Sequence, residues 1–303
     1  MVRPGVLPSW CARFGVAAVL AVFTAPALVG CTSPPPPPPP PVETVQEVVL
    51  RYKFAPVRLR QDVAVTAKAS GAGMEATADV ALTGILDVQP IGTRFKVVHS
   101  VAEVWRAELS ESLAPKPAPD EPPVDFKARI AATRGATIVD VRGAVEKEAT
   151  KTLPERGEGS DFDLVGWGVL ALPELPEAAL VPGVPVDDTS REIAELVGVK
   201  FEIETTTTYT LRDLTEQDGR RIATVDIASE ARGRQAQKGP GPIIGAERSG
   251  TVVFDVGAQL PLRSEMTMMT VLDFGFNVTA GISVRAESSY TLEEAGAAAP
   301  SEP

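Results

Sequence analysis

Most of the chain after residue 45 has hydrophobic side chains at every second position. Residues 48–54 and 80–88 alternate apolar with polar or charged side chains, and residues 95–101, 126–130 and 139–145 continue the pattern. A period of two places one side of a β-strand on a core and the other in water. The first half is therefore predicted to be a series of half-buried strands, residues 126–130 included.

The same period returns in the second half of the chain. Residues 199–212 alternate regularly, a turn is predicted at residues 216–219, and a hairpin is predicted for residues 251–268 around Gly257. Residues 274–293 alternate over a stretch far longer than the usual strand of about five or six residues. We expect this stretch either to bend or to be split by a turn near Gly281.

Two segments interrupt the alternation. Residues 114–123 are rich in Pro and are predicted to be a surface loop, because Pro cannot donate to a strand ladder. In residues 162–196, Thr189 or Ser190 can cap a short helix over residues 191–196, ended by Gly198. The predicted fold class is all-β and mainly antiparallel. It has one or two strongly curved sheets, half-barrel or sandwich-like, with one or two short helices between two halves.

The start of the chain has the parts of a bacterial export signal. Arg3 and Arg13 are its only charged residues, and the apolar run at residues 14–23 is shorter than the ~20 residues of a membrane span. Leu28, Val29, Gly30 and Cys31 then resemble the lipobox of bacterial lipoproteins. The alternatives are an ordinary secretory leader with a chance Cys and an uncleaved N-terminal helix.

The lipobox resemblance implies three things about these residues. Signal peptidase would recognise Leu28, Val29 and Gly30 and cut before Cys31, whose thiol would carry a diacylglycerol and an acyl chain. No other cofactor is expected. Thr32 stands where enteric lipoproteins retained in the inner membrane have Asp, which favours the outer membrane, facing the periplasm or the cell surface.

The predicted domain organisation follows from these boundaries. Residues 1–30 are a cleaved signal peptide, residues 31–44 the lipidated Cys and a tether, residues 45–294 the β-rich domain, and residues 295–303 a disordered tail. The tether contains eight consecutive prolines, which favour a polyproline II rod of roughly 25 Å at ~3.1 Å per residue. The β-rich domain can also be divided into two similar halves, about 45–155 and 197–294, joined by 156–196.

Net charge argues against one class of partner, and cysteine content argues against disulfides and Cys-based metal sites. The formal net charge is −11, and removal of the two leader arginines and no acid lowers it to −13. Such a chain is poorly suited to nucleic acid, since binding there depends on Lys and Arg that neutralise phosphates. Cys11 lies in the predicted leader, so no disulfide or Cys-based metal site is expected in the mature chain.

Few residues indicate catalysis. His99 is the only histidine and lies in an alternating strand, where a structural role is the simplest interpretation. No Gly-x-Ser-x-Gly sequence is present, and one His without a free Cys leaves no soft-metal site. A carboxylate pair for glycoside chemistry cannot be identified from spacing, because the fold brings such acids together.

Several short motifs resemble a family of uncharacterised bacterial lipoproteins. They are Leu172-Pro-Glu-Leu-Pro176, Pro182-Gly-Val184, Tyr209-Thr-Leu211, Gly250-Thr-Val-Val-Phe-Asp255 and Leu260-Pro-Leu-Arg-Ser-Glu265. The family has a central Pro-x-x-Pro segment, a Gly followed shortly by Trp, and a C-terminal Gly-x-x-x-Phe-Asp strand. This chain departs from it at the Trp, since Val184 follows Gly183 and begins Val-Pro-Val-Asp-Asp. The resemblance assigns no catalytic or ligand residues.

Together these features predict a membrane-anchored envelope lipoprotein that acts as a non-enzymatic binding or assembly module. Its expected partners are the membrane through the lipid, the lipoprotein export and sorting machinery, and an envelope protein or a hydrophobic ligand. Met266, Met268, Phe274 and Phe276 are candidates for a ligand lining, with ordinary core as the other interpretation. The alternative function is an envelope-polymer hydrolase with a carboxylate pair.

Overall fold

The computed structural model describes residues 46–53, 55–71, 74–110, 125–146, 149–150, 153, 169–196, 199–235, 243–273 and 279–293. All of them belong to one compact unit, Thr44–Pro303. The elements in these ranges are β1 (Val57–Gly71), β2 (Met74–Ile91), β3 (Arg94–Leu109), α1 (Phe126–Ala131), β4 (Arg134–Val139), β5 (Pro185–Leu196), β6 (Val199–Gln217), β7 (Arg220–Gln235), β8 (Ile243–Asp255), β9 (Leu260–Asp273) and β10 (Thr279–Leu292). The predicted leader, the tether and the tail lie outside the described residues.

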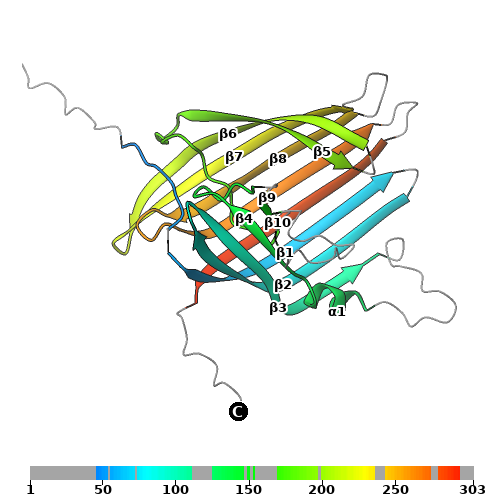
Figure 1. Cartoon of the computed structure of the whole chain (residues 1–303), viewed down its shortest axis with the longest axis horizontal. Coiled ribbons are helices and arrows are strands. Elements are labelled where there is room, and N and C mark those ends of the chain that lie inside the picture. The colour runs from blue at the N-terminus through cyan, green and yellow to red at the C-terminus, as the bar shows by residue number, and fades with distance from the viewer. Residues whose placement is uncertain are drawn as a thin grey trace, which may run out of the picture. The chain divides into compact units, whose positions relative to one another are not determined.

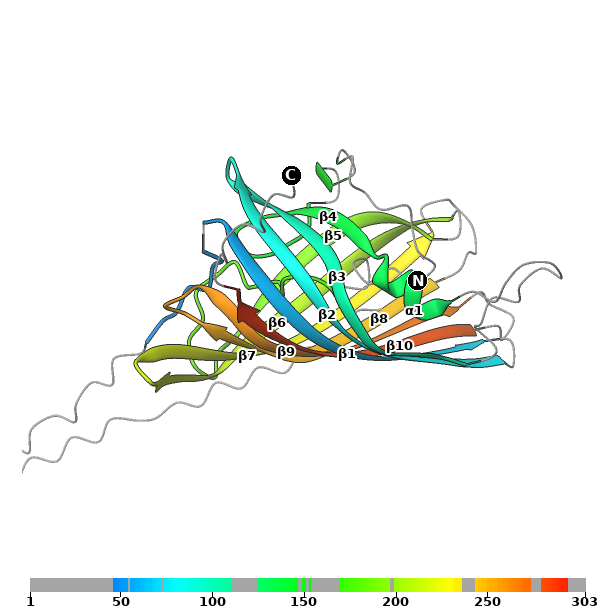
Figure 2. The ribbon, with the colours of Figure 1, turned by 90° about the horizontal axis from the view of Figure 1, so that it is seen from below.

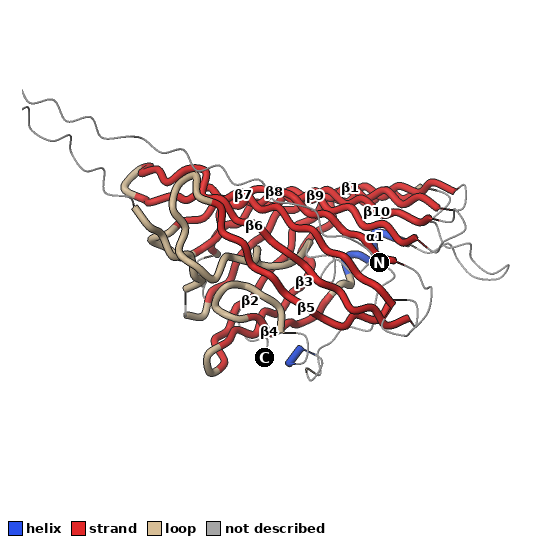
Figure 3. The backbone as a smooth tube through the Cα atoms, turned by 90° about the horizontal axis from the view of Figure 1, so that it is seen from above, coloured by secondary structure: helices blue, strands red, loops and turns tan. Residues whose placement is uncertain are grey.

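The strands form a single antiparallel sheet in the order β4-β3-β2-β1-β10-β9-β8-β7-β6-β5 (Figure 1). Each strand pairs with its neighbour in the sequence, except that β1 pairs with β10 and that β4 and β5 are the two edges. The sheet is strongly curved, and Figures 2 and 3 show its two edge strands turned toward each other. The predicted fold class is confirmed as one curved sheet, open between β4 and β5.

The two faces of this sheet differ in polarity. On the convex face, charged side chains pair across neighbouring strands, as in Arg285–Glu265 at 2.8 Å and Arg106–Asp79 at 2.7 Å. Exposed pairs of this kind contribute at most about 1 kcal/mol each, so they identify the water-facing side more than they stabilise it. The alternate positions face the concave side and supply the core.

The prediction of a strand at residues 126–130 is wrong, because these residues form α1. Phe126 and Ile130 are four residues apart and therefore share one face of a helix as well as one face of a strand. The Asp125 carboxylate caps the helix by accepting a hydrogen bond from the Ala128 backbone N–H at 3.0 Å. Ile130 is buried on the concave side of the sheet, whereas Ala128 is exposed.

The prediction of a helix at residues 191–196 is also wrong, because these residues are the second half of β5. Pairing with β6 satisfies backbone groups that such a short helix would leave unbonded at its ends. Arg191 lies opposite Glu204 in the register, and their side chains form an ion pair at 2.7 Å. The local capping signal was therefore outweighed by strand pairing.

Other predicted boundaries can be compared directly with the strands. The turn at residues 216–219 and the hairpin around Gly257 are confirmed by the β6–β7 and β8–β9 pairs. Gly281 does not end a strand, because it lies inside β10 opposite Ser70. Val48, Leu50 and Tyr52 are buried as predicted but lie outside the named strands, and only Val48 forms an isolated bridge, to Leu180.

Candidate functional site

One part of the concave face is covered by residues 169–184, which are called the strap here. Backbone carbonyls of the strap accept hydrogen bonds from side chains of the sheet and of the segment before it. Gln61 donates to Val169 at 2.8 Å, Tyr290 to Ala171 at 3.1 Å, and Tyr52 to Pro173 at 2.6 Å. Seven apolar side chains of the strap are buried: Val169, Leu170, Leu172, Pro173, Leu175, Pro176 and Leu180. The sheet is therefore filled with side chains where the strap crosses it.

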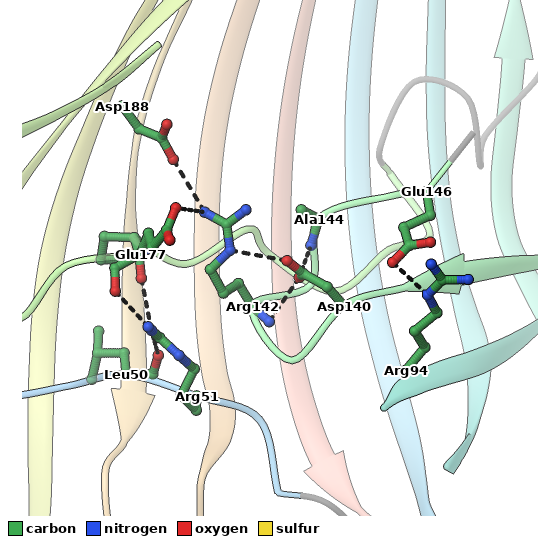
Figure 4. Close-up of polar contacts among 10 residues, drawn as sticks. Leu50, Arg51, Arg94, Asp140, Arg142, Ala144, Glu146, Glu177 and Asp188 are labelled. Carbon is green, nitrogen blue, oxygen red and sulfur yellow. Dashed lines mark hydrogen bonds and ion pairs between the residues drawn. The ribbon is translucent and has the colours of Figure 1, made fainter. Parts of the chain in front are cut away.

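Arg142 connects this strap region to both edges of the sheet. It follows β4, and its guanidinium binds Asp140 at 2.9 Å and Asp188 of β5 at 3.1 Å, with Glu177 of the strap at 3.9 Å (Figure 4). Burial disfavours the charge, but the hydrogen bonds and attraction from Asp140 and Asp188 outweigh it and raise the Arg142 pKa. The arginine thus spans the gap between β4 and β5 on the strap side.

A second arginine fixes the strap to the N-terminal segment. The Arg51 guanidinium donates to the carbonyl oxygens of Pro176, at 2.8 Å, and Glu177 (Figure 4). The turn after β4 is ordered in the same way, since the Asp140 carboxylate accepts from the backbone N–H of Arg142 and Ala144. These contacts hold one end of the concave face closed.

The part of the concave face away from the strap is less completely buried. Along the inner positions of β8, Phe254 and Val252 are 0 % exposed, whereas Gly250, Arg248 and Ala246 are half-buried. The inner-facing neighbours of Arg248 and Ala246 on β6, β7 and β9 are also half-buried, whereas Ile227 and Tyr209, in the row of Gly250, are buried. We call this surface the open inner face and define it by Thr205, Thr207, Ser229, Ala231, Ala246, Arg248, Met266, Met268 and Thr270.

The open inner face consists of methyl groups, small side chains and short hydroxyls, with one cation. The register places Thr207, Ser229, Arg248 and Met268 in one row across β6 to β9. The hydroxyls of Thr207 and Ser229 hydrogen-bond to each other at 2.9 Å. Among the inner-facing positions of these four strands that the structure describes in this region, Arg248 alone is charged.

Polar groups on several elements influence the charge of Arg248. Desolvation by burial lowers the Arg248 pKa, while the charge of Glu174 on the strap acts in the opposite direction. Burial raises the Glu174 pKa, with Arg248 as the largest opposing influence. Burial also raises the pKa of Tyr209 and raises that of Tyr290 to about 12, so both phenols are neutral at physiological pH. Among the described residues, Glu174 is therefore the negative charge that acts most strongly on Arg248.

The structure locates only some of the residues selected from the sequence. Met266 and Met268 lie on the open inner face, and Met268 also packs against the cluster that contains Val284. Phe274, Phe276, Leu28, Val29, Gly30 and Cys31 lie outside the described residues. Sequence reasoning missed Arg248, although a single charge on an otherwise apolar stripe from Ile244 to Phe254 was a usable signal. It also missed Glu174, for which the Pro-rich strap gave no signal.

His99 belongs to the packed interior. It is 1 % exposed, and its Nε2 lies 2.8 Å from the Thr137 hydroxyl. Burial lowers the pKa of His99 to about 4, so the imidazole is neutral at physiological pH.

Within the described ranges, no three His, Cys, Asp or Glu side chains gather closely enough to hold a metal ion. The carboxylate-pair hypothesis stays a prediction, and two acids close to the strap, Asp140 and Asp188, are engaged by Arg142.

Comparisons with known proteins give little further information. No family model matches the chain, and no curated protein matches it. Among solved structures, an outer membrane channel from Pseudomonas putida F1 aligns over 80 % of this chain and 98 % of its own, with 11 % identity and a TM-score of 0.19. That score is too low for any conclusion about fold or function. In the described part of the chain, no helix has the length and apolar character needed to cross a bilayer.

Proposed function

We propose that this protein is a lipid-anchored lipoprotein of the bacterial envelope that acts as a non-enzymatic binding module and holds an apolar chain against the open inner face. The supporting observation is the change in exposure along β8, from fully buried Val252 to half-buried Gly250, Arg248 and Ala246. Half-buried apolar side chains on a concave surface, such as Met266 and Met268, can be covered by an apolar ligand.

The side chains of the open inner face suit a flexible apolar ligand. Ala231 and Ala246 face each other across β7 and β8, and Thr205 and Thr270 extend the same row on β6 and β9. Small side chains leave a smooth surface, and Met266 and Met268 can adapt their unbranched chains to different shapes. Each methylene transferred from water to such a surface contributes about 0.8 kcal/mol before the cost of ordering.

Blocking the open inner face tests this proposal. The fluorescent probe N-phenylnaphthylamine is uncharged and apolar, and its emission rises when it leaves water. Ala246→Trp places an indole in the centre of the surface and is expected to reduce probe affinity at least about tenfold, because the indole occupies the binding volume. Unchanged thermal stability would show that the sheet is intact.

Ala228→Trp is the matched control for this variant. Ala228 is exposed on the convex face of β7, between Thr208 and Ser249 in the register. The Ala228→Trp variant adds the same indole to the same region of the sheet, but on the opposite face. Equal probe binding by wild type, Ala246→Trp and Ala228→Trp would refute the proposal.

A further inference from the structure

Arg248 is the residue of the open inner face that a purely apolar ligand does not explain. No hydrogen bond and no ion pair within 4.0 Å engages its guanidinium among the residues that the structure describes. Its neighbours in the row do not compensate, since the Ser229 hydroxyl is bonded to Thr207 and Met268 offers no charge. A half-buried guanidinium with five donors and few acceptors around it is costly to maintain.

The surroundings of Arg248 define the position of a ligand. Toward the strap, Val252 and Phe254 are 0 % exposed, so no space remains in that direction. Toward the start of β8, Ala246 is half-buried, and Ile244, which is buried, ends the row of inner side chains. Four residues of an antiparallel strand extend ~14 Å at ~3.4 Å each. The cation and Ile244 are therefore about that far apart along β8, and the half-buried surface lies between them.

We propose that Arg248 binds the anionic headgroup of an amphiphile, a carboxylate or a phosphate, whose apolar chain lies along the open inner face toward Ile244. This inference rests on the function proposed above and adds the class of ligand. The planar guanidinium matches either anion through paired hydrogen bonds. A bound anion would take over the compensation of the Arg248 charge that Glu174 supplies from a longer distance.

The negative net charge of the chain means that tighter binding of an anionic than of an uncharged amphiphile would be informative. At −11 the protein as a whole repels anions, so a preference for an acidic ligand must arise from a local positive group. Laurate and lauryl alcohol have chains of the same length and differ in headgroup charge. Competition of each with N-phenylnaphthylamine on the full-length protein is expected to show laurate binding at least about tenfold more tightly.

Two variants separate the guanidinium from general effects of charge. Arg248→Gln is expected to abolish the preference for laurate and to leave lauryl alcohol binding unchanged, whereas Arg248→Lys retains part of the preference. Arg263→Gln is the matched control, because Arg263 is exposed on the neighbouring strand β9 and lies on the convex face. It is expected to bind both compounds as wild type does.

Glu174→Gln provides a test in the opposite direction. Removal of this carboxylate takes away the negative charge that acts most strongly on Arg248 among the described residues, so the affinity for laurate is expected to rise, while that for lauryl alcohol stays constant. If Arg248→Gln keeps the wild-type preference, or if wild type binds both compounds equally, the inference is overturned and the proposed function stands. If neither compound nor the probe binds, both are overturned.

Discussion

The turn after β4 allows a quantitative test of how the strap closes one end of the sheet. Gly143 in this turn has φ 86°, a conformation that L-residues rarely adopt. A Cβ at Gly143 would lie 2.7 Å from the Pro173 carbonyl oxygen in the strap and 2.9 Å from Cε2 of Tyr52. Gly143→Ala therefore combines an unfavourable backbone conformation with a collision against two anchored groups.

Gly92 provides the matched comparison. Its φ is 60°, and a Cβ there would meet nothing within 4 Å. Gly92→Ala should cost about 1 kcal/mol of unfolding free energy for the backbone conformation alone. Gly143→Ala should cost the same amount plus about 1 to 3 kcal/mol for overpacking, because the Pro173 carbonyl is held by Tyr52 and cannot move freely.

Equilibrium unfolding in urea, followed by far-ultraviolet circular dichroism, measures both changes. The midpoint should fall in the order wild type, Gly92→Ala, Gly143→Ala, with the slope of free energy against urea unchanged. If the two variants lose the same stability, the strap is not packed against this turn, and the reasoning about the closed end is refuted.

Two further predictions concern His99 and Cys31. Because burial holds the His99 pKa near 4, its neutral form contributes stability above pH 6.5 that is lost as the pH falls toward 4. Denaturant titrations of His99→Gln should therefore show about 3 kcal/mol less destabilisation between pH 7 and pH 4 than wild type does; parallel losses would contradict the assigned burial effect. Metabolic labelling with palmitate should mark wild type and not Cys31→Ser, and equal labelling would remove the proposed anchor.

The regular alternation of the sequence was sufficient to predict an antiparallel all-β fold. It also predicted the β6–β7 turn and the β8–β9 hairpin, because Gly219 and Gly257 interrupt long period-two stretches at the right places. Alternation was less reliable where another structure satisfies the same spacing. Phe126 and Ile130 share a face in either a strand or a helix, and only the packing of Ile130 on the sheet decides between them.

The site was harder to predict than the fold. Met266 and Val252 follow the same period-two rule, yet Val252 is fully buried and Met266 half-buried. The difference depends on where the strap crosses the sheet, and that is fixed by contacts between residues far apart in the sequence, such as Tyr52 with Pro173. Glu174 approaches Arg248 for the same reason, so no local pattern could pair them.

The central claim is that the open inner face holds an apolar chain in the native protein. Native mass spectrometry of wild type and Ala246→Trp, each purified with its native membrane lipids, tests it most directly. We expect wild type to retain a non-covalent apolar adduct that dissociates on denaturation and that Ala246→Trp lacks. Absence of the adduct from wild type, or its presence in equal amount in both proteins, would contradict the claim.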